Sequence, residues 1–161
     1  METRGGTAYL QRRCDNWINL CALIARCVQF GLFDARADDG WYPRDDIPDG
    51  LRKYHPVEII DKCSLTVAAQ YILLAGPKIY EELVEVRGGI PKKVTHDMWL
   101  HWEQRLKEIA DVLGKKSDLG CMARKAYEKM RSLRYKPTRV VEPGLEIGGG
   151  RWLGLARVFG S

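Results

Sequence analysis

The sequence lacks the short motifs that usually identify an enzyme. It contains no Gly-x-Ser-x-Gly nucleophile elbow, no phosphate-binding loop and no Gly-x-Gly-x-x-Gly dinucleotide fingerprint. The glycine cluster at 148–150 follows no predicted strand and opens no predicted helix, so it does not have the context of a phosphate cradle. No reaction class follows from the motifs. Whether the protein is an enzyme stays open, and a non-catalytic role is favoured.

The cysteines do not have the number or the spacing of a disulfide framework or a zinc site. There are five, an odd number, and no two of them form a Cys-x-x-Cys pair. Four stand among apolar residues in segments with a helical pattern, where cysteine acts as a small hydrophobic side chain. We therefore expect free thiols and a reducing compartment. The five are Cys14, Cys21, Cys27, Cys63 and Cys121.

Long hydrophobic runs are also missing. The longest uncharged run, Cys63–Pro77, has 15 residues, whereas a helix that spans a bilayer needs about 20 apolar residues. The first seven residues are polar and glycine-rich, unlike a secretory leader. These features predict a soluble, intracellular protein, cytoplasmic or nuclear, without a membrane partner.

Charge is distributed unevenly along the chain. Residues 1–123 hold 17 Lys and Arg against 18 Asp and Glu, whereas residues 124–161 hold nine basic against three acidic residues. The basic end could follow a phosphate backbone, but its charges are spread around a predicted helix, so nucleic-acid binding is the weakest of the functions considered. From composition we predict a helical domain over residues 1–136 and a flexible, glycine-rich tail over 137–161.

Hydrophobic periodicity predicts an all-α, bundle-like domain of about five helices. Apolar residues recur every three or four positions over 8–33, 56–75, 78–86, 95–113 and 118–134. The segment 56–75 is apolar on nearly all sides, which is typical of a buried central helix. Gly76-Pro77 is expected to stop or kink it. Thr95, Gly114 and either Ser117 or Asp118 are the expected helix caps, while Trp17, Trp99 and Trp102 are expected in or near the core.

Turn-forming residues dominate the segment from Asp34 to Tyr54, which we predict to lack regular structure. A loop of this length is either functional or flexible. Trp41 is the aromatic residue in it that we expect to contact a ligand or partner. The aspartates of this loop do not have the spacing of a calcium-binding loop, and His96 and His101 are about 140° apart on one helix, so we expect neither a metal site nor a cofactor.

A small group of polar residues could line a ligand pocket inside the bundle. Gln70 stands in the apolar central helix, where its amide needs a hydrogen-bond partner. Tyr71 follows it, and Asp97 is four residues before His101, so that this carboxylate could orient the imidazole. The candidate ligand-binding residues are thus Gln70, Tyr71, Asp97, His101 and Trp41, with no catalytic assignment.

The order of these elements resembles a fungal family catalogued as domain of unknown function 3632. The resemblance covers about residues 9–134 and implies a fungal source, an all-helical fold and no assigned activity or catalytic residue. It is carried by Trp17-Ile18-Asn19-Leu20, Val67-Ala68-Ala69-Gln70-Tyr71-Ile72, Ala75-Gly76-Pro77-Lys78-Ile79-Tyr80, Met98-Trp99-Leu100-His101-Trp102-Glu103 and Ala123-Arg124-Lys125-Ala126-Tyr127-Glu128-Lys129-Met130.

Two main functions remain compatible with the sequence. The first is a non-catalytic protein-interaction module that presents a groove or the Trp41 loop. The second is a small-molecule-binding protein or enzyme of specialised metabolism with a pocket inside the bundle. A closed apolar pocket larger than about 300 Å³ beside Gln70 and His101 would favour the second.

Overall fold

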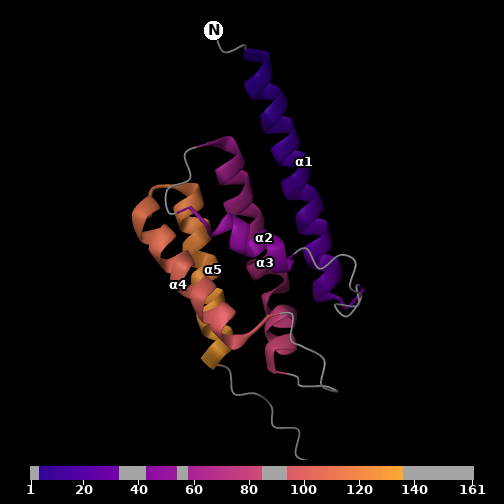
Figure 1. Cartoon of the computed structure of the whole chain (residues 1–161), viewed down its shortest axis with the longest axis vertical. Coiled ribbons are helices and arrows are strands. Elements are labelled where there is room, and N and C mark those ends of the chain that lie inside the picture. Colours follow the sequence, from indigo (N-terminus) through magenta and orange to yellow (C-terminus); the bar gives the residue numbers. More distant parts are fainter. Residues whose placement is uncertain (1–3, 33–42, 54–57, 85–93, 136–161) are drawn as a thin grey trace, which may run out of the picture.

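The computed structural model describes residues 4–32, 43–53, 58–84 and 94–135, and these form five helices without a strand. In chain order they are α1 (Arg4–Gln29), α2 (Pro43–Gly50), α3 (Ile59–Val84), α4 (His96–Leu113) and α5 (Asp118–Tyr135) (Figure 1). The predicted all-α, bundle-like fold is confirmed.

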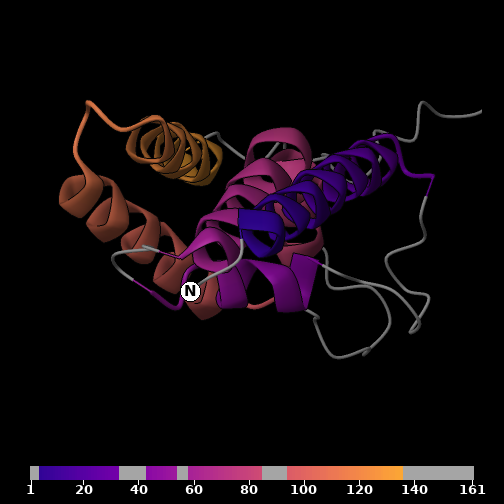
Figure 2. The ribbon, with the colours of Figure 1, turned by 90° about the horizontal axis from the view of Figure 1, so that it is seen from above.

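Helix α3 is the centre of the bundle, as its apolar pattern predicts. It packs against α1, α2 and α5, while α4 packs mainly on α5. Seen from above, α1 lies on one side of α3 and the α4–α5 pair lies on the other (Figure 2). The core that joins these layers is formed by large, fully buried side chains, among them Leu65, Ile72, Ile79, Trp99, Leu106, Ile109 and Met130.

Of the two outcomes expected at Gly76-Pro77, a stop or a kink, the stop is wrong, and residues 78–84 do not form a separate helix. Helix α3 begins at Ile59 and continues through Pro77 to Val84. A proline inside a helix removes one backbone hydrogen bond. Tertiary packing offsets that loss here, because Ile79 is fully buried and the Tyr80 ring lies 5.0 Å from the ring centre of Trp99.

Helix α3 is long and apolar enough over Ile59–Glu81 to cross a membrane by length and composition, and it is the one such helix in the described part of the chain. Half of that segment is buried against the other helices. Core helices of soluble proteins satisfy the same criterion. The central position of α3 in the bundle is therefore enough to explain why it is long and apolar.

The prediction that residues 34–54 lack regular structure is also wrong, because α2 forms within this segment. Pro43 suits the first turn of a helix, and Asp45 and Asp46 lie favourably near its N-terminus. Ile47 and Leu51 are buried and anchor the short helix in the core. Burial of these two apolar side chains thus stabilises a helix in spite of the turn-forming residues around them.

The predicted caps of α4 and α5 are confirmed. The Thr95 hydroxyl accepts a hydrogen bond from the Met98 amide at 3.2 Å, and Gly114 ends α4 with a positive φ of 72°. The Ser117 hydroxyl accepts a bond from the Gly120 amide at the start of α5. Helix α1 ends in a Schellman motif at Gly31, where the Leu32 amide donates to the Cys27 carbonyl and the Gly31 amide donates to that of Val28.

Several predictions fall on residues outside the described ranges. These include the proposed contact through Trp41, the predicted start of the central helix at residue 56 and the glycine-rich tail at 137–161. The division of the chain at residue 136 stays a prediction.

Candidate functional site

The apolar face of helix α1 is wider than the part of it that the other helices bury. Cys14, Cys21, Ala25 and Val28 are buried on the side toward α3. Beside this buried stripe, large apolar side chains are exposed along the helix and at the residue that follows it. They are Tyr9 (61% exposed), Leu10 (39%), Trp17 (37%), Leu20 (47%), Leu23 (57%) and Phe30 (76%). We call this second stripe the α1 outer face.

The exposed position of Trp17 corrects a prediction. Leu10, Trp17 and Leu20 share the helical period of the buried residues, so the pattern predicts that all of them face the core. In the structure α1 lies at the edge of the bundle, and α3 is its main neighbour (Figures 1 and 2). A single neighbouring helix covers only part of an apolar arc this wide. The width of the arc was the available signal for an exposed apolar face.

A groove of about 580 Å³ runs along the boundary between α1 and the first turns of α3. Leu10, Trp17 and Leu20 form its α1 side, and Ile60, which is 57% exposed, lies on its α3 side. Arg13, Asn16 and Ser64 supply its polar groups. The groove is therefore an apolar surface with a thin polar edge, and exposed apolar surfaces of this kind on soluble proteins often mark interaction sites.

Two buried thiols form the floor of this groove. The Cys63 thiol lies 3.7 Å from the Cys14 backbone carbonyl, and the Cys14 thiol lies 4.0 Å from that of Ile59. Burial, followed by the neighbouring Cys14 thiol, raises the pKa of Cys63 to about 12. The thiolate form, which is the reactive one, is therefore disfavoured, and these cysteines act as core residues that join α1 to α3.

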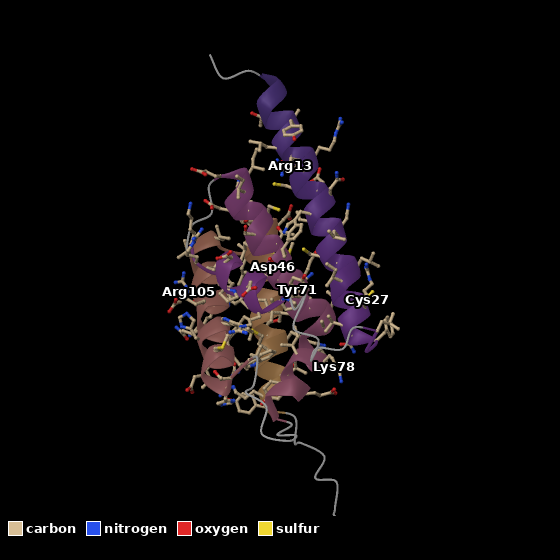
Figure 3. All side chains as sticks on the ribbon, turned by 45° about the vertical axis from the view of Figure 1, so that its right-hand side comes forward. Arg13, Cys27, Asp46, Tyr71, Lys78 and Arg105 are labelled. Atoms are coloured by element: carbon tan, nitrogen blue, oxygen red, sulfur yellow. The ribbon has the colours of Figure 1, made fainter. Side chains whose placement is uncertain are left out.

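A second polar group lies where α1, α2 and α3 meet. Asp46 of α2, Cys21 of α1 and Tyr71 of α3 surround one point, with the Cys21 sulfur 4.0 Å from the Asp46 carboxylate (Figure 3 labels Asp46 and Tyr71). Tyr71 is fully buried, and its hydroxyl has no hydrogen-bond partner of standard geometry among the described residues. Burial raises the pKa of all three side chains, that of Cys21 to about 11. Burial therefore makes the charged form of each side chain less favourable than it is in water.

Replacing Asp46 by asparagine is expected to stabilise the protein at neutral pH by up to about 1 kcal/mol. Burial raises the pKa of Asp46 in the folded state, so ionisation costs stability as the pH rises through that value. Below a pH of about 4 both the folded and the unfolded carboxyl are protonated, so this difference between the two proteins should disappear. Thermal unfolding of both between pH 3 and about 8 measures it.

Asp45→Asn is the matched control, because Asp45 lies in the same first turn of α2 but is exposed. Both substitutions remove one negative charge near the helix N-terminus. An equal stabilisation by Asp45→Asn would show that burial of the Asp46 carboxyl is not the cause of the effect.

The structure does not assemble the other candidate ligand residues into one pocket. Asp97 and His101 are exposed on α4, and no hydrogen bond or ion pair joins them among the described residues. Gln70 is half-buried on α3, and its side-chain oxygen is buried without a partner in the described part of the chain. Neither the main groove nor a smaller hollow of about 260 Å³ beside it is lined by Gln70 or His101.

Part of the basic charge on α5 is neutralised within the bundle. Arg134 contacts the buried Glu103 carboxylate at 3.0 Å, and Arg124 pairs with Asp111, so both link α5 to α4. Lys136 and Arg139 lie outside the described residues. Over the described ranges, no three His, Cys, Asp or Glu side chains gather closely enough to hold a metal ion.

The fold and the surface together define an all-helical protein with a central helix and one wide apolar face on its outermost helix. Comparison with known families gives the more specific assignment. The chain belongs to the family described as "Protein of unknown function (DUF3632)", whose model matches residues 3–106, from α1 into the second half of α4. No curated protein and no solved structure matches the chain.

Proposed function

We propose that this protein is a non-catalytic, intracellular protein-interaction module, and that the α1 outer face is its contact surface. The observation that carries the proposal is the row of exposed apolar side chains from Tyr9 to Phe30, continuous with the groove that Ile60 borders. Removal of such surface from water is favourable by about 25 cal/mol per Å², so a partner that covers it gains binding free energy.

The shape of this surface favours a protein partner over a small molecule. From Tyr9 to Leu23 the helical part of the face extends over 14 residues, or roughly 21 Å at 1.5 Å per residue. That length suits a helix or another extended protein segment. The reactive groups near it are unsuited to catalysis at neutral pH, since burial raises the pKa of both Cys21 and Cys63.

A photo-crosslinking side chain at Leu20 should join the protein to a partner inside the cells that produce it. The change is Leu20→p-benzoylphenylalanine, and the expected result is a discrete crosslinked product on a denaturing gel. The control places the same group at Val112, which is 54% exposed on α4 and far from α1 in the chain. No discrete product at position 20, or equal products at both positions, would contradict the proposed function.

A second candidate function is binding of an apolar small molecule in the same groove. It is favoured by the volume of about 580 Å³, which lies within the range of roughly 300–1,000 Å³ typical of ligand sites. A groove filled by a small molecule would leave position 20 without a protein crosslink, so the experiment above separates the two functions.

A further inference from the structure

We propose that the partner of the α1 outer face is a second copy of this chain, and that two α1 helices pair antiparallel about a two-fold axis. This inference rests on the proposed function, since it specifies what covers the same surface. Two-fold pairing is the commonest symmetric arrangement of soluble proteins, and it requires a surface that is complementary to itself.

Three residues of the α1 outer face belong to a seam along α1 that has the heptad spacing of a helix-pairing surface. Leu10, Trp17 and Ile24 stand seven residues apart, and a second series, Arg13, Leu20 and Cys27, follows three residues behind the first. This alternation of three and four residues over 17 positions is the a/d pattern of a coiled coil. All six side chains are exposed or partly exposed on the isolated chain.

Most of this seam lies apart from the contact that α1 makes inside its own chain, although Ile24, which is partly buried, also packs against the core. At 100° per residue, the centre of the seam lies about a quarter turn around α1 from the stripe that contains Cys14, Cys21 and Ala25. A partner helix can therefore approach α1 without displacing α3. The first turns of α1 also extend past the end of α3, which leaves them accessible (Figure 1).

The charge of Arg13 decides the direction of the pairing. In a parallel pair Arg13 would face Arg13 of the partner subunit, which places like charges in contact. In an antiparallel pair a positions face d positions, so Trp17 meets Leu20 of the partner subunit and Leu10 meets Cys27 of the partner subunit. Arg13 then lies beside Ile24 of the partner subunit, about 16 Å along the axis from the other arginine.

The exposed apolar area is sufficient for a dimer. Seven large apolar side chains, six on the α1 outer face and Ile60, are between 37% and 76% exposed. Each leaves on the order of 100 Å² accessible, so two copies could bury roughly 1,400 Å² in total. Specific interfaces bury about 1,200–2,000 Å².

Analytical ultracentrifugation of the purified chain tests the dimer. The wild-type protein should sediment at twice the chain mass of 18.4 kDa, that is 36.8 kDa, at concentrations of about 100 μM. Leu20→Glu should raise the dimer dissociation constant by about tenfold or more, since it places two buried charges in each interface. Val112→Glu adds the same charge to α4 and should leave the dissociation constant unchanged. Circular dichroism verifies that each variant keeps its helices.

Disulfide crosslinking tests the direction. In a Cys121→Ser background, which removes the exposed thiol of α5, Leu10→Cys should give a covalent dimer under a mild oxidant. Its bond would join position 10 to Cys27 of the partner subunit, so adding Cys27→Ser should abolish it. A parallel pair would instead give a Cys27–Cys27 bond without the substitution at position 10.

The outcomes separate this inference from the proposed function. A wild-type chain that is monomeric at 100 μM overturns the dimer, and a Cys27–Cys27 bond overturns the antiparallel direction. If the chain is monomeric while position 20 still crosslinks to a different protein in cells, the interaction module stands and only the identity of its partner is wrong. Absence of both the dimer and any crosslink overturns both.

Discussion

Replacing Arg105 by alanine is expected to lower the free energy of unfolding by about 3 kcal/mol. Arg105 is 7% exposed, and its guanidinium donates from Nε and Nη2 to the Leu51 carbonyl at 3.0 and 2.6 Å, and from Nη2 to the Arg52 carbonyl at 2.8 Å. These carbonyls lie just beyond the C-terminus of α2, where a helix leaves backbone acceptors unsatisfied and carries partial negative charge. Arg105 thus acts as a cap supplied by α4, and urea unfolding of the variant measures its contribution.

Two further variants separate the cap from a general effect of charge. Arg105→Lys keeps the positive charge but lacks the planar fork, so it should recover only part of the lost stability. Arg124→Ala removes an equally charged side chain whose ion pair with Asp111 is exposed to solvent, and its effect should be much smaller. Equal losses in Arg105→Ala and Arg124→Ala would show that α2 does not depend on this cap.

Arg105 illustrates why the helices were easier to predict from the sequence than the side-chain hydrogen bonds that join one helix to another. The apolar periods of α1, α3, α4 and α5, and the caps Thr95 and Gly114, are local signals, so the all-α class and most helix ends followed from them. The bonds from Arg105 to α2 join residues more than 50 positions apart. No local pattern around Arg105 specifies which carbonyls it will reach.

The two errors in the helices have the same origin. The local preferences of Gly76-Pro77 and of the aspartates around α2 predict no helix at these positions. Both segments are nevertheless helical, because Ile79 and Ile47 are packed in the core. Tertiary contacts commonly override propensity in this way. The predicted number of helices agrees with the structure because one expected break is absent and one unexpected helix is present.

The candidate surface was visible in the sequence as an unusually wide apolar arc on α1. Periodicity alone does not say how much of such an arc the rest of the chain will cover, and this depends on where α1 lies in the bundle. The structure places it at the edge, so the residues nearest α3 are buried and Trp17 and Leu20 are not. Gln70 and the polar candidates on α4 line neither of the two hollows, and spacing along one helix does not show which residues of another helix it will meet.

A single methyl group at Gly50 is expected to destabilise the protein by about 2–3 kcal/mol. Gly50 lies at the end of α2, and a Cβ atom built on it would come within 2.6 Å of the Ala68 Cβ and closer still to the Ser64 carbonyl of α3. The Ser64 carbonyl belongs to the helix backbone and the Ala68 Cβ is bonded directly to it, so neither can move away by a side-chain rotation. Gly50→Ala must therefore separate α2 from α3 and loosen the burial of Ile47 and Leu51. Urea unfolding of the variant measures the loss.

Gly76→Ala provides the matched control within the same core. A Cβ at Gly76 would be in tight contact with the end of the Leu133 side chain, at 3.3 Å, and in ordinary contact with Ile72 and Lys129, and the Leu133 side chain can shift slightly. Alanine also favours the helical state over glycine by up to about 1 kcal/mol, and Gly76 lies inside α3. The same substitution should thus be neutral or stabilising at position 76 and clearly destabilising at position 50. Similar effects at both sites would mean that the contact between α2 and α3 is less close than the structure describes.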